Sequence, residues 1–200
     1  MKFNMSFIAQ DVKTIHPDAE EKIRDLFNVN KKVTIYYDMD NTICLWAEKG
    51  KDAETLPLTR KKGFFRNLKP IDDCQTAIPM LQKLSFKVKI ISACIDTPYC
   101  KKEKLEWIKE HLPSIRSKDV ILCNIGENKA LYADDIKNSI LIDDYGKNIQ
   151  DWIEAGGIAI KKSRSNKQRQ IPVVRNHMDI FNVLEELGIL KKAYQTENVG

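Results

Sequence analysis

The chain has 200 residues and a formal net charge of +5, and 42% of its residues are hydrophobic and 30% charged. This composition is typical of a globular protein and argues against a disordered, fibrous or membrane chain. No stretch approaches the roughly 18 consecutive apolar residues of a membrane helix, and the amino-terminal segment lacks the apolar block of a secretory signal peptide. We therefore expect a cytoplasmic protein with no membrane partner.

The five cysteines are scattered along the chain and form no C-x-x-C pair. This spacing argues against both a disulfide framework and a zinc knuckle. We expect the cysteines to behave as small buried hydrophobic residues.

Short apolar runs alternate with amphipathic segments from about residue 33 onward. This alternation predicts an α/β fold with a doubly wound, mostly parallel, Rossmann-like sheet. The predicted strands are residues 33–37, 87–92, 119–123, 139–142 and 157–161. The predicted helices, whose apolar residues recur every three or four positions, are residues 72–84, 98–112, 146–156 and 177–190.

Two segments do not follow this alternation. Residues 1–30, where Pro17 precedes acidic residues, are predicted to be a helical appendage to a core domain at 31–200. Residues of about 45–72 are polar and interrupted by glycine and proline, so we expect a small cap inserted after the first strand. The basic run at 161–170 is long enough to touch nucleic acid, but a solvated loop is the expected interpretation.

Four carboxylates follow two of the predicted strands. Asp38 and Asp40 come directly after the first strand, and Asp143 and Asp144 come at the end of the fourth. Aspartate at one strand end is a common turn residue. Here two such ends should meet at the edge of the sheet where α/β proteins bind ligands. Four carboxylates there would repel one another strongly unless a cation lay among them, and oxygen ligands of this kind suit Mg²⁺.

Two further positions add a candidate phosphate site. The second strand ends at Ser92 and Ala93, and this strand end supplies a hydroxyl at the same edge. Lys129 lies fourteen residues before Asp143, where a connecting helix would carry it to the same edge. A strand-end hydroxyl is common, and Lys129 alone would be taken for a surface lysine. In this order, however, the D-x-D-x-T, serine, lysine and D-D motifs resemble the haloacid dehalogenase-like (HAD) phosphatase superfamily.

The resemblance narrows to the 5'(3')-deoxyribonucleotidase family over roughly residues 33–190. It is carried by DMDNT, by GFFRNLKPIDDCQTAIPMLQKL and by NKALYADDIKNSILIDD. It implies that Lys129 holds the phosphate, so that Lys104→Ala, in a different helical segment, should have little effect. Two features depart from the family: Asn41 replaces its usual glycine, and the cap is shorter than in the mammalian enzymes.

The resemblance also implies roles for the carboxylates. Asp38 would attack phosphorus and Asp40 would act as the acid and base. Mg²⁺ would be held by Asp38, by the main-chain carbonyl of Asp40 and by Asp144, with Asp143 bonding a metal-bound water or orienting Lys129. Ser92 and Lys129 would hold the phosphate oxygens.

Aromatic residues of the cap are candidates for contact with a nucleobase. Trp46 lies where the family places an aromatic residue that faces the base, although packing under the cap is an equally good interpretation. Phe64, with Phe65 beside it, could close the other side of the base, or anchor the cap to the sheet. Trp107 and Trp152 have apolar neighbours at helical spacing and are expected in the core.

The sequence therefore favours a Mg²⁺-dependent phosphomonoesterase that acts on (deoxy)ribonucleoside monophosphates through an aspartyl-phosphate. One alternative keeps the chemistry but changes the substrate to another small phosphoester or a nucleic-acid end. A second is a non-catalytic interaction domain, which the intact set of site residues argues against. The expected partner is a small phosphoester rather than nucleic acid, and a homodimer is left open.

Overall fold

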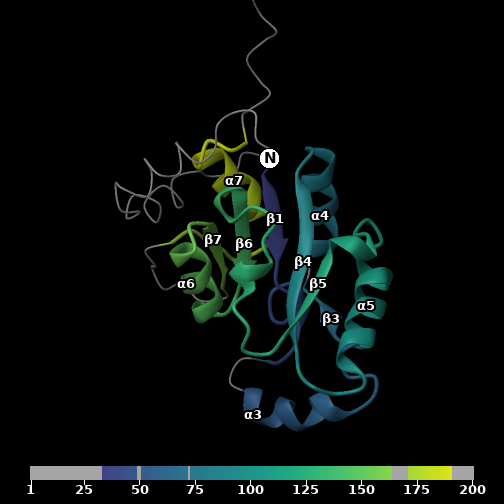
Figure 1. Cartoon of the computed structure of the whole chain (residues 1–200). Coiled ribbons are helices and arrows are strands. Elements are labelled where there is room, and N and C mark those ends of the chain that lie inside the picture. The colour runs from purple at the N-terminus through teal and green to yellow at the C-terminus, as the bar shows by residue number, and fades with distance from the viewer. Residues whose placement is uncertain (1–32, 49–50, 72, 164–170, 191–200) are drawn as a thin grey trace, which may run out of the picture.

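A central sheet organises the computed structural model, which describes residues 33–48, 51–71, 73–163 and 171–190. The strands of this sheet are β1 (Thr34–Tyr37), β4 (Lys87–Cys94), β5 (Val120–Asn124), β6 (Ser139–Asp143), β7 (Ile158–Lys162) and β8 (Val173–Val174). Their order across the sheet is β5-β4-β1-β6-β7-β8, and every neighbouring pair is parallel (Figure 1). The predicted mostly parallel α/β fold is confirmed.

Helices cover both faces of the sheet. They are α4 (Cys74–Lys83), α5 (Cys100–His111), α6 (Gly146–Glu154) and α7 (Asp179–Glu186). Side chains alternate between the faces of a strand. Tyr37 of β1 therefore packs in the larger core with α4, α5 and α7, and Tyr36 packs in the smaller core with α6. Trp107 and Trp152 are fully buried, one in each core, as predicted.

The central strands carry the site at their carboxyl ends. Every residue of β1 and β6 is buried, as expected for parallel strands covered on both faces. The register pairs Tyr37 with Ile90 of β4 and with Ile142 of β6. The residues that follow these three strands are therefore brought to one edge of the sheet.

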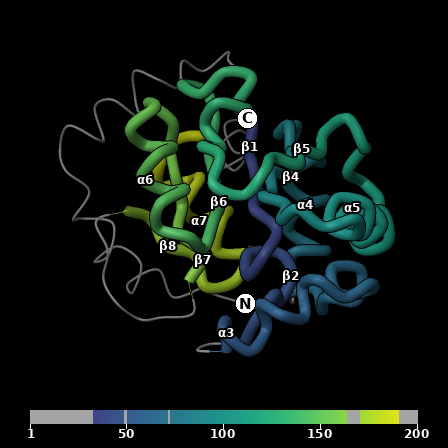
Figure 2. Tube along the Cα trace, turned by 60° about the horizontal axis from the view of Figure 1, so that its bottom comes forward, coloured from purple at the N-terminus to yellow at the C-terminus, as the bar shows by residue number. Residues whose placement is uncertain are grey.

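The segment between β1 and α4 extends beyond this edge, where the cap was predicted (Figure 2). It contains the antiparallel strands β2 (Cys44–Leu45) and β3 (Lys69–Pro70), the helix α3 (Asp52–Thr55) and the 3-10 helix η1 (Leu56–Arg60). No side chain of α3 is buried, and η1 buries only Thr59. This segment has little core of its own.

Two parts of the fold differ from the sequence prediction. The short edge strand β8 was not predicted. The connection from β5 to β6 is not the expected helix but contains the 3-10 helices η3 (Lys129–Tyr132) and η4 (Ile136–Asn138). Asp134, between them, pairs with Lys87 at 2.7 Å and Lys89 at 2.8 Å, both on β4. Ion pairs to the sheet thus hold this connection where helical packing was expected.

The basic run at 161–170 is only partly described. Lys161 and Lys162 belong to β7 and are buried, so the interpretation as a solvated loop is wrong for them, whereas the predicted strand at 157–161 is confirmed. Their ammonium groups contact the main-chain carbonyls of Asp144 and Arg175. Residues 164–170 and the predicted appendage at 1–30 lie outside the described residues.

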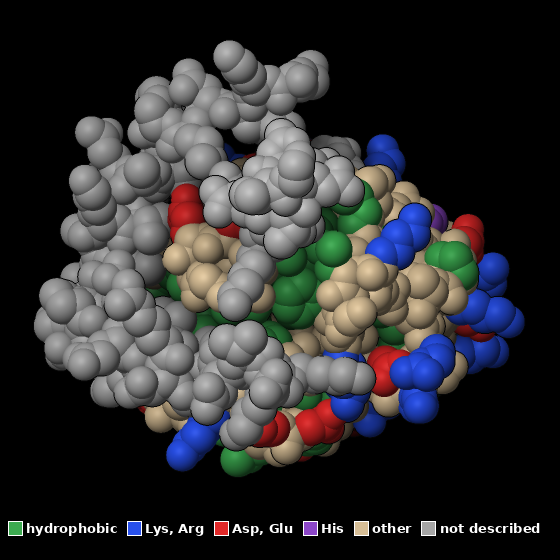
Figure 3. Space-filling model, turned by 90° about the horizontal axis from the view of Figure 1, so that it is seen from above, with side chains coloured by type: hydrophobic (Ala, Val, Ile, Leu, Met, Phe, Trp, Pro, Cys, Tyr) green, Lys and Arg blue, Asp and Glu red, His purple; other side chains and the backbone are tan. Residues whose placement is uncertain are grey.

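The surface at the opposite end of the sheet from the cap carries hydrophobic side chains near its centre and lysine and arginine side chains toward one side (Figure 3).

None of the described helices is long and apolar enough to cross a membrane. All five cysteines lie among the described residues and are buried, as predicted, and none of them is in a disulfide.

Candidate active site

The loop after β1 is shaped by local hydrogen bonds. The Asp38 N–H donates to the carbonyl of Ile142 at 2.9 Å, which extends the pairing of β1 with β6 by one residue. Asn41 has a φ of 57°, in the left-handed region that asparagine tolerates better than most residues. Its Oδ1 accepts the N–H groups of Trp46 and Ala47 at 3.2 and 3.1 Å. Asparagine thus fills the position where the family usually has glycine and also fastens the start of the cap.

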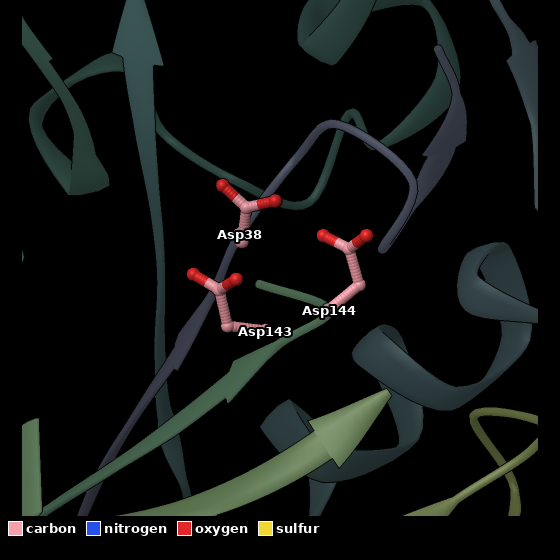
Figure 4. A group of neighbouring side chains, drawn as sticks. All are labelled: Asp38, Asp143 and Asp144. Carbon is pink, nitrogen blue, oxygen red and sulfur yellow. The ribbon is translucent and has the colours of Figure 1, made fainter. Parts of the chain in front are cut away.

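Three of the four predicted carboxylates form one group. Among the described residues, oxygen atoms of Asp38, Asp143 and Asp144 all lie within 4.8 Å of one another (Figure 4). They come from the ends of β1 and β6, as their positions in the sequence predicted. Asp40 is outside this group because its side chain is held elsewhere.

Lys129 reaches this carboxylate group and is almost fully buried. Its Nζ lies 2.5 Å from Oδ1 of Asp38 and 2.8 Å from Oδ2 of Asp143. Burial opposes its charge, but the two carboxylates raise the pKa of Lys129. The ammonium group therefore stays charged and joins the ends of β1 and β6.

The neighbouring carboxylates Asp143 and Asp144 have different surroundings. Asp143 is fully buried, and besides Lys129 it accepts the N–H of Tyr145 at 2.7 Å and the side-chain amide of Asn148 at 2.9 Å. Asp144 is only partly buried, and its backbone N–H donates to Oγ1 of Thr42 at 3.1 Å. Both Asp143 oxygens are therefore already used, whereas no described residue donates to the Asp144 carboxylate.

Burial and mutual repulsion disfavour the charged forms of these two carboxylates. Burial, followed by the charge of Asp38, raises the pKa of Asp143 to about 6. Burial, followed by the charges of Asp38 and Asp143, raises the pKa of Asp144 to about 8. A cation at this position would relieve the repulsion.

Lys104 of α5 also lies in the site, although the sequence analysis did not place it there. It is fully buried, and its Nζ lies 2.5 Å from Oδ2 of Asp40 and 2.8 Å from Oγ of Ser92. The third contact of Nζ is the carbonyl of Ala93, at 2.8 Å. Although burial opposes its charge, Asp40 raises the pKa of Lys104.

The sequence contains a signal that Lys104 is buried. The buried residues of α5 are spaced as one helical stripe: Cys100, Glu103, Lys104, Trp107 and Ile108. Charged residues on the core-facing stripe of a helix need partners, because unpaired buried charges are costly. The position of Lys104 within this stripe could therefore have predicted a contact with the carboxylates.

His177 is a second residue that sequence reasoning missed. It is buried, and its Nε2 donates to the carbonyl of Thr42 at 2.9 Å. Asp73, just before α4, accepts the backbone N–H groups of His177 and Met178 at 2.9 and 2.8 Å. Burial lowers the pKa of His177 to about 4. These contacts join residues more than a hundred positions apart, and no local motif indicates them.

The predicted aromatic residues differ in burial. Trp46 and Phe64 are partly exposed and pack against the larger core. Phe65 is buried, stacks edge-on against Phe64 at 5.0 Å between ring centroids, and lies 5.2 Å from Nζ of Lys104. Phe65 therefore anchors the cap, whereas Trp46 and Phe64 retain exposed surface.

Comparison with known proteins identifies the family. The family model described as "5' nucleotidase, deoxy (Pyrimidine), cytosolic type C protein" matches residues 46–187. The chain belongs to this family. The match covers Ser92, Lys104, Lys129, Asp143 and Asp144 but begins after the loop with Asp38 and Asp40, so those two are placed by the geometry of the sheet.

Curated relatives agree with membership of this nucleotidase family. The 5'(3')-deoxyribonucleotidases of Bacillus subtilis (strain 168) and Bacillus phage SPbeta are each 34% identical over 88 residues. These matches cover 44% of this chain and 46% of each relative, so the chain spans about half the length of the curated relatives it matches.

Among solved structures, a HAD family hydrolase from Deinococcus radiodurans R1 gives a TM-score of 0.57 at 10% identity. That similarity covers 81% of this chain and 99% of the other. An L-2-haloacid dehalogenase from Xanthobacter autotrophicus gives 0.55 at 9% identity, over 78% and 99%. These similarities show that the chain shares the fold of these hydrolases, and the family model confirms the predicted resemblance to deoxyribonucleotidases.

Proposed function

We propose that this protein is a Mg²⁺-dependent phosphomonoesterase that removes phosphate from deoxyribonucleoside monophosphates in the cytoplasm. The proposal depends above all on one observation: Lys129 joins Asp38 to Asp143, beside Asp144, while Asp40 is held apart from this group. A nucleophile, a cation site and a separate acid are the parts that phosphoryl transfer through an aspartate requires. Family membership and the related deoxyribonucleotidases support the substrate class.

In the first step, a carboxylate oxygen of Asp38 attacks phosphorus. A bond from this oxygen to phosphorus forms, and the bond from phosphorus to the nucleoside oxygen breaks. Asp40 gives its proton to the departing oxygen, so the nucleoside leaves as a neutral alcohol. The aspartyl-phosphate on Asp38 divides one difficult displacement into two easier ones.

In the second step, Asp40 takes a proton from a water molecule. The resulting hydroxide attacks phosphorus, the bond to Asp38 breaks, and inorganic phosphate leaves. Asp38 is again a carboxylate and Asp40 is again protonated. Burial raises the pKa of Asp40, against the opposing charge of Lys104, which suits a group that alternates between the two forms.

The residues present fit Mg²⁺. Carboxylate oxygens of Asp38, Asp143 and Asp144 converge within 4.8 Å, and hard oxygen donors are those that Mg²⁺ prefers. Asp38, Asp144 and the main-chain carbonyl of Asp40 would hold the ion, and Asp143, whose oxygens have other partners, would orient Lys129. When bound, Mg²⁺ neutralises charge as the two anions meet.

Three groups at the neighbouring strand end would hold the phosphate. Lys129 would release part of its contact with Asp38 to a phosphate oxygen. Ser92 accepts a hydrogen bond from Lys104, so its own O–H remains to donate to phosphate. The backbone N–H of Ala93 would add a third donor. Positioning and electrostatic stabilisation of this kind supply most of the catalysis in phosphoryl transfer.

The cap would supply recognition of the nucleoside. Trp46 and Phe64 both retain exposed surface at the start and end of this segment. An aromatic face stacks on any base for about 1 to 3 kcal/mol, so these residues would favour nucleotides over sugar phosphates without choosing sharply among bases.

The proposal can be tested by phosphate release from a panel of substrates. The panel contains ribo- and deoxyribonucleoside 5'- and 3'-monophosphates, sugar phosphates and a 3'-phosphorylated oligonucleotide, each with Mg²⁺ or with EDTA. We expect the highest kcat/KM for deoxyribonucleoside monophosphates and no turnover after chelation. Asp38→Asn should lower turnover by about four orders of magnitude, equivalent to about 5.5 kcal/mol of barrier.

The matched control is Asp151→Asn, which makes the same change where the carboxylate pairs with Lys147 on the surface of α6. This variant should keep wild-type activity. Turnover by Asp38→Asn within about tenfold of wild type, about 1.4 kcal/mol, would exclude the proposed nucleophile. Preference for the oligonucleotide or a sugar phosphate would leave the chemistry in place but change the substrate.

A further inference from the structure

Lys104 uses all three of its donors inside the protein. An ammonium group carries three N–H bonds, and the three contacts of Nζ are Asp40, Ser92 and the carbonyl of Ala93, at 2.5, 2.8 and 2.8 Å. Burying a lysine is costly unless it is paired and hydrogen-bonded. Its interactions thus tie Asp40, from the loop after β1, to the end of β4.

The two buried lysines serve different carboxylates. Lys129 contacts Asp38 and Asp143 within the group that would hold the metal, whereas Lys104 contacts Asp40 outside it. Asp38 and Asp40 are only two residues apart in the chain. Because each of these aspartates pairs with a different lysine, the nucleophile and the acid are kept in different places.

The contact with Lys104 also distinguishes the two oxygens of Asp40. Oδ2 accepts from Nζ at 2.5 Å, whereas Oδ1 accepts only a long, weak contact from the thiol of Cys44, whose sulfur lies 4.0 Å away. An oxygen that accepts a short bond from an ammonium group is poorly placed to carry a proton. Oδ1 is therefore the oxygen that remains to exchange a proton with the substrate.

We infer that Lys104 is a positioning residue for the acid of the reaction: it holds Oδ2 of Asp40 so that Oδ1 faces the departing oxygen. This inference rests on the proposed function. Because Nζ also holds Ser92, one cation sets the position of the acid relative to the phosphate. Lys104 keeps its proton throughout. The proton that moves to the leaving group comes from Oδ1 of Asp40.

Leaving groups that differ in their need for a proton test this role. Lys104→Met removes the charge while keeping a long side chain. The nucleoside of a deoxyribonucleoside monophosphate needs a proton to leave as an alcohol, whereas p-nitrophenyl phosphate releases a stable phenolate without help. General acid catalysis contributes about 10²- to 10⁴-fold. We expect kcat/KM, which reports the first phosphoryl transfer, to fall about 100-fold or more for the nucleotide and less than about fivefold for the aryl ester.

A double-mutant cycle with Asp40→Asn shows whether Lys104 acts through Asp40. In that background, Lys104→Met should lower kcat/KM for the nucleotide by less than about threefold, because the group it positions is already lost. If the losses instead multiply, or if Lys104→Met harms both esters equally, Lys104 does not position the acid and the inference is wrong. Lys101→Met, on the exposed face of α5, is the matched control and should change neither substrate.

Loss of folding and failure of the proposed function can each be distinguished from failure of the inference. If Lys104→Met alone fails to fold, the double variant, which removes both charges, takes its place. The inference requires the double variant to have the same activity as Asp40→Asn on both esters. A difference between these two variants overturns the inference. If Asp38→Asn retains turnover, the proposed function fails whatever Lys104 does. If Asp38→Asn is inactive but the two esters respond alike to Lys104→Met, only the inference fails.

Discussion

The carboxyl edge of the sheet and the cap above it are built in different ways. At the edge, Asp38, Lys129 and Asp143 are 5%, 3% and 0% exposed, on or beside strands buried on both faces. In the cap, α3 buries no side chain and η1 buries one. The groups assigned to chemistry thus lie on a buried support, and those assigned to substrate recognition lie on a segment whose helices bury a single side chain.

The cap anchors lead back to α5. Glu103 accepts the N–H groups of Gly63 and Phe65 at 2.6 and 3.1 Å, and the indole N–H of Trp107 donates to the carbonyl of Leu68 at 2.7 Å. Gly63 has a φ of 86°, which most other residues would adopt only with strain. The helix that provides Lys104 therefore also holds the cap, so the two regions share one support. Substitutions at Asp38 and Lys129 should therefore affect every substrate, and substitutions in the cap should affect only substrates with a base.

Among the substitutions that compare these two regions, the largest effect is expected from Lys129→Met. This variant removes the ammonium group that pairs with Asp38 and would stabilise the transferring phosphate. Removal of one such donor lowers kcat by about 10²- to 10³-fold. We expect kcat/KM to fall by this factor alike for nucleotides and for p-nitrophenyl phosphate. Lys137→Met, at an exposed position of η4, is the control and should match wild type. A loss confined to nucleotides would break the comparison, because it would place Lys129 with recognition.

A smaller and selective effect is expected from Trp46→Ala. If its ring stacks on the base, the loss of about 1 to 3 kcal/mol should raise KM for nucleoside monophosphates by roughly five- to a hundredfold. Hydrolysis of p-nitrophenyl phosphate, which has no base, should be nearly unchanged. Steady-state kinetics on the two esters measure both effects. Equal losses on both would mean that Trp46 supports the fold, in agreement with its contact with the larger core.

The carboxyl edge of the sheet and the cap also differ in how much of their structure the sequence could predict. Strand ends were predictable because continuous apolar runs define buried parallel strands, and topology then brings Asp38 and Asp144 together. Lys129 was found through its motif, although the expected helix around it is two 3-10 helices held by Asp134. The cap could be located by its polar composition, but its internal structure depends on single contacts such as that of Glu103 with Gly63.

Residues that act across long sequence separations were the ones missed. Lys104 lies 64 residues from Asp40, and His177 lies 135 residues from Thr42. For Lys104, the helical stripe was a usable signal. For His177, tertiary packing alone decides the contact, because β8 and α7 must first be in place.

The smallest expected effect concerns the electrostatics of the edge and is measured as stability. The pKa of Asp144 is about 8 and that of Asp143 about 6, both above the ordinary 3.8 because of burial and the charge of Asp38. A carboxyl whose pKa is raised on folding binds more protons in the folded state than in the unfolded state. Its contribution to stability is therefore largest at low pH and declines as pH rises from about 4 to about 8.

Mg²⁺ binds the deprotonated carboxylates, so its stabilising effect should grow over the same range of pH. At a concentration tenfold above Kd it would add about 1.4 kcal/mol, which raises Tm by about 3 to 6 °C for a chain of this size. We expect a shift of that order at pH 8 and less than about 1 °C at pH 5.5. Asp144→Asn should abolish the shift at pH 8, whereas Trp46→Ala, in the cap, should keep it. An equal shift at both pH values would show that metal binding releases no proton, and loss of the shift in Trp46→Ala would show that the cap and the edge do not act independently.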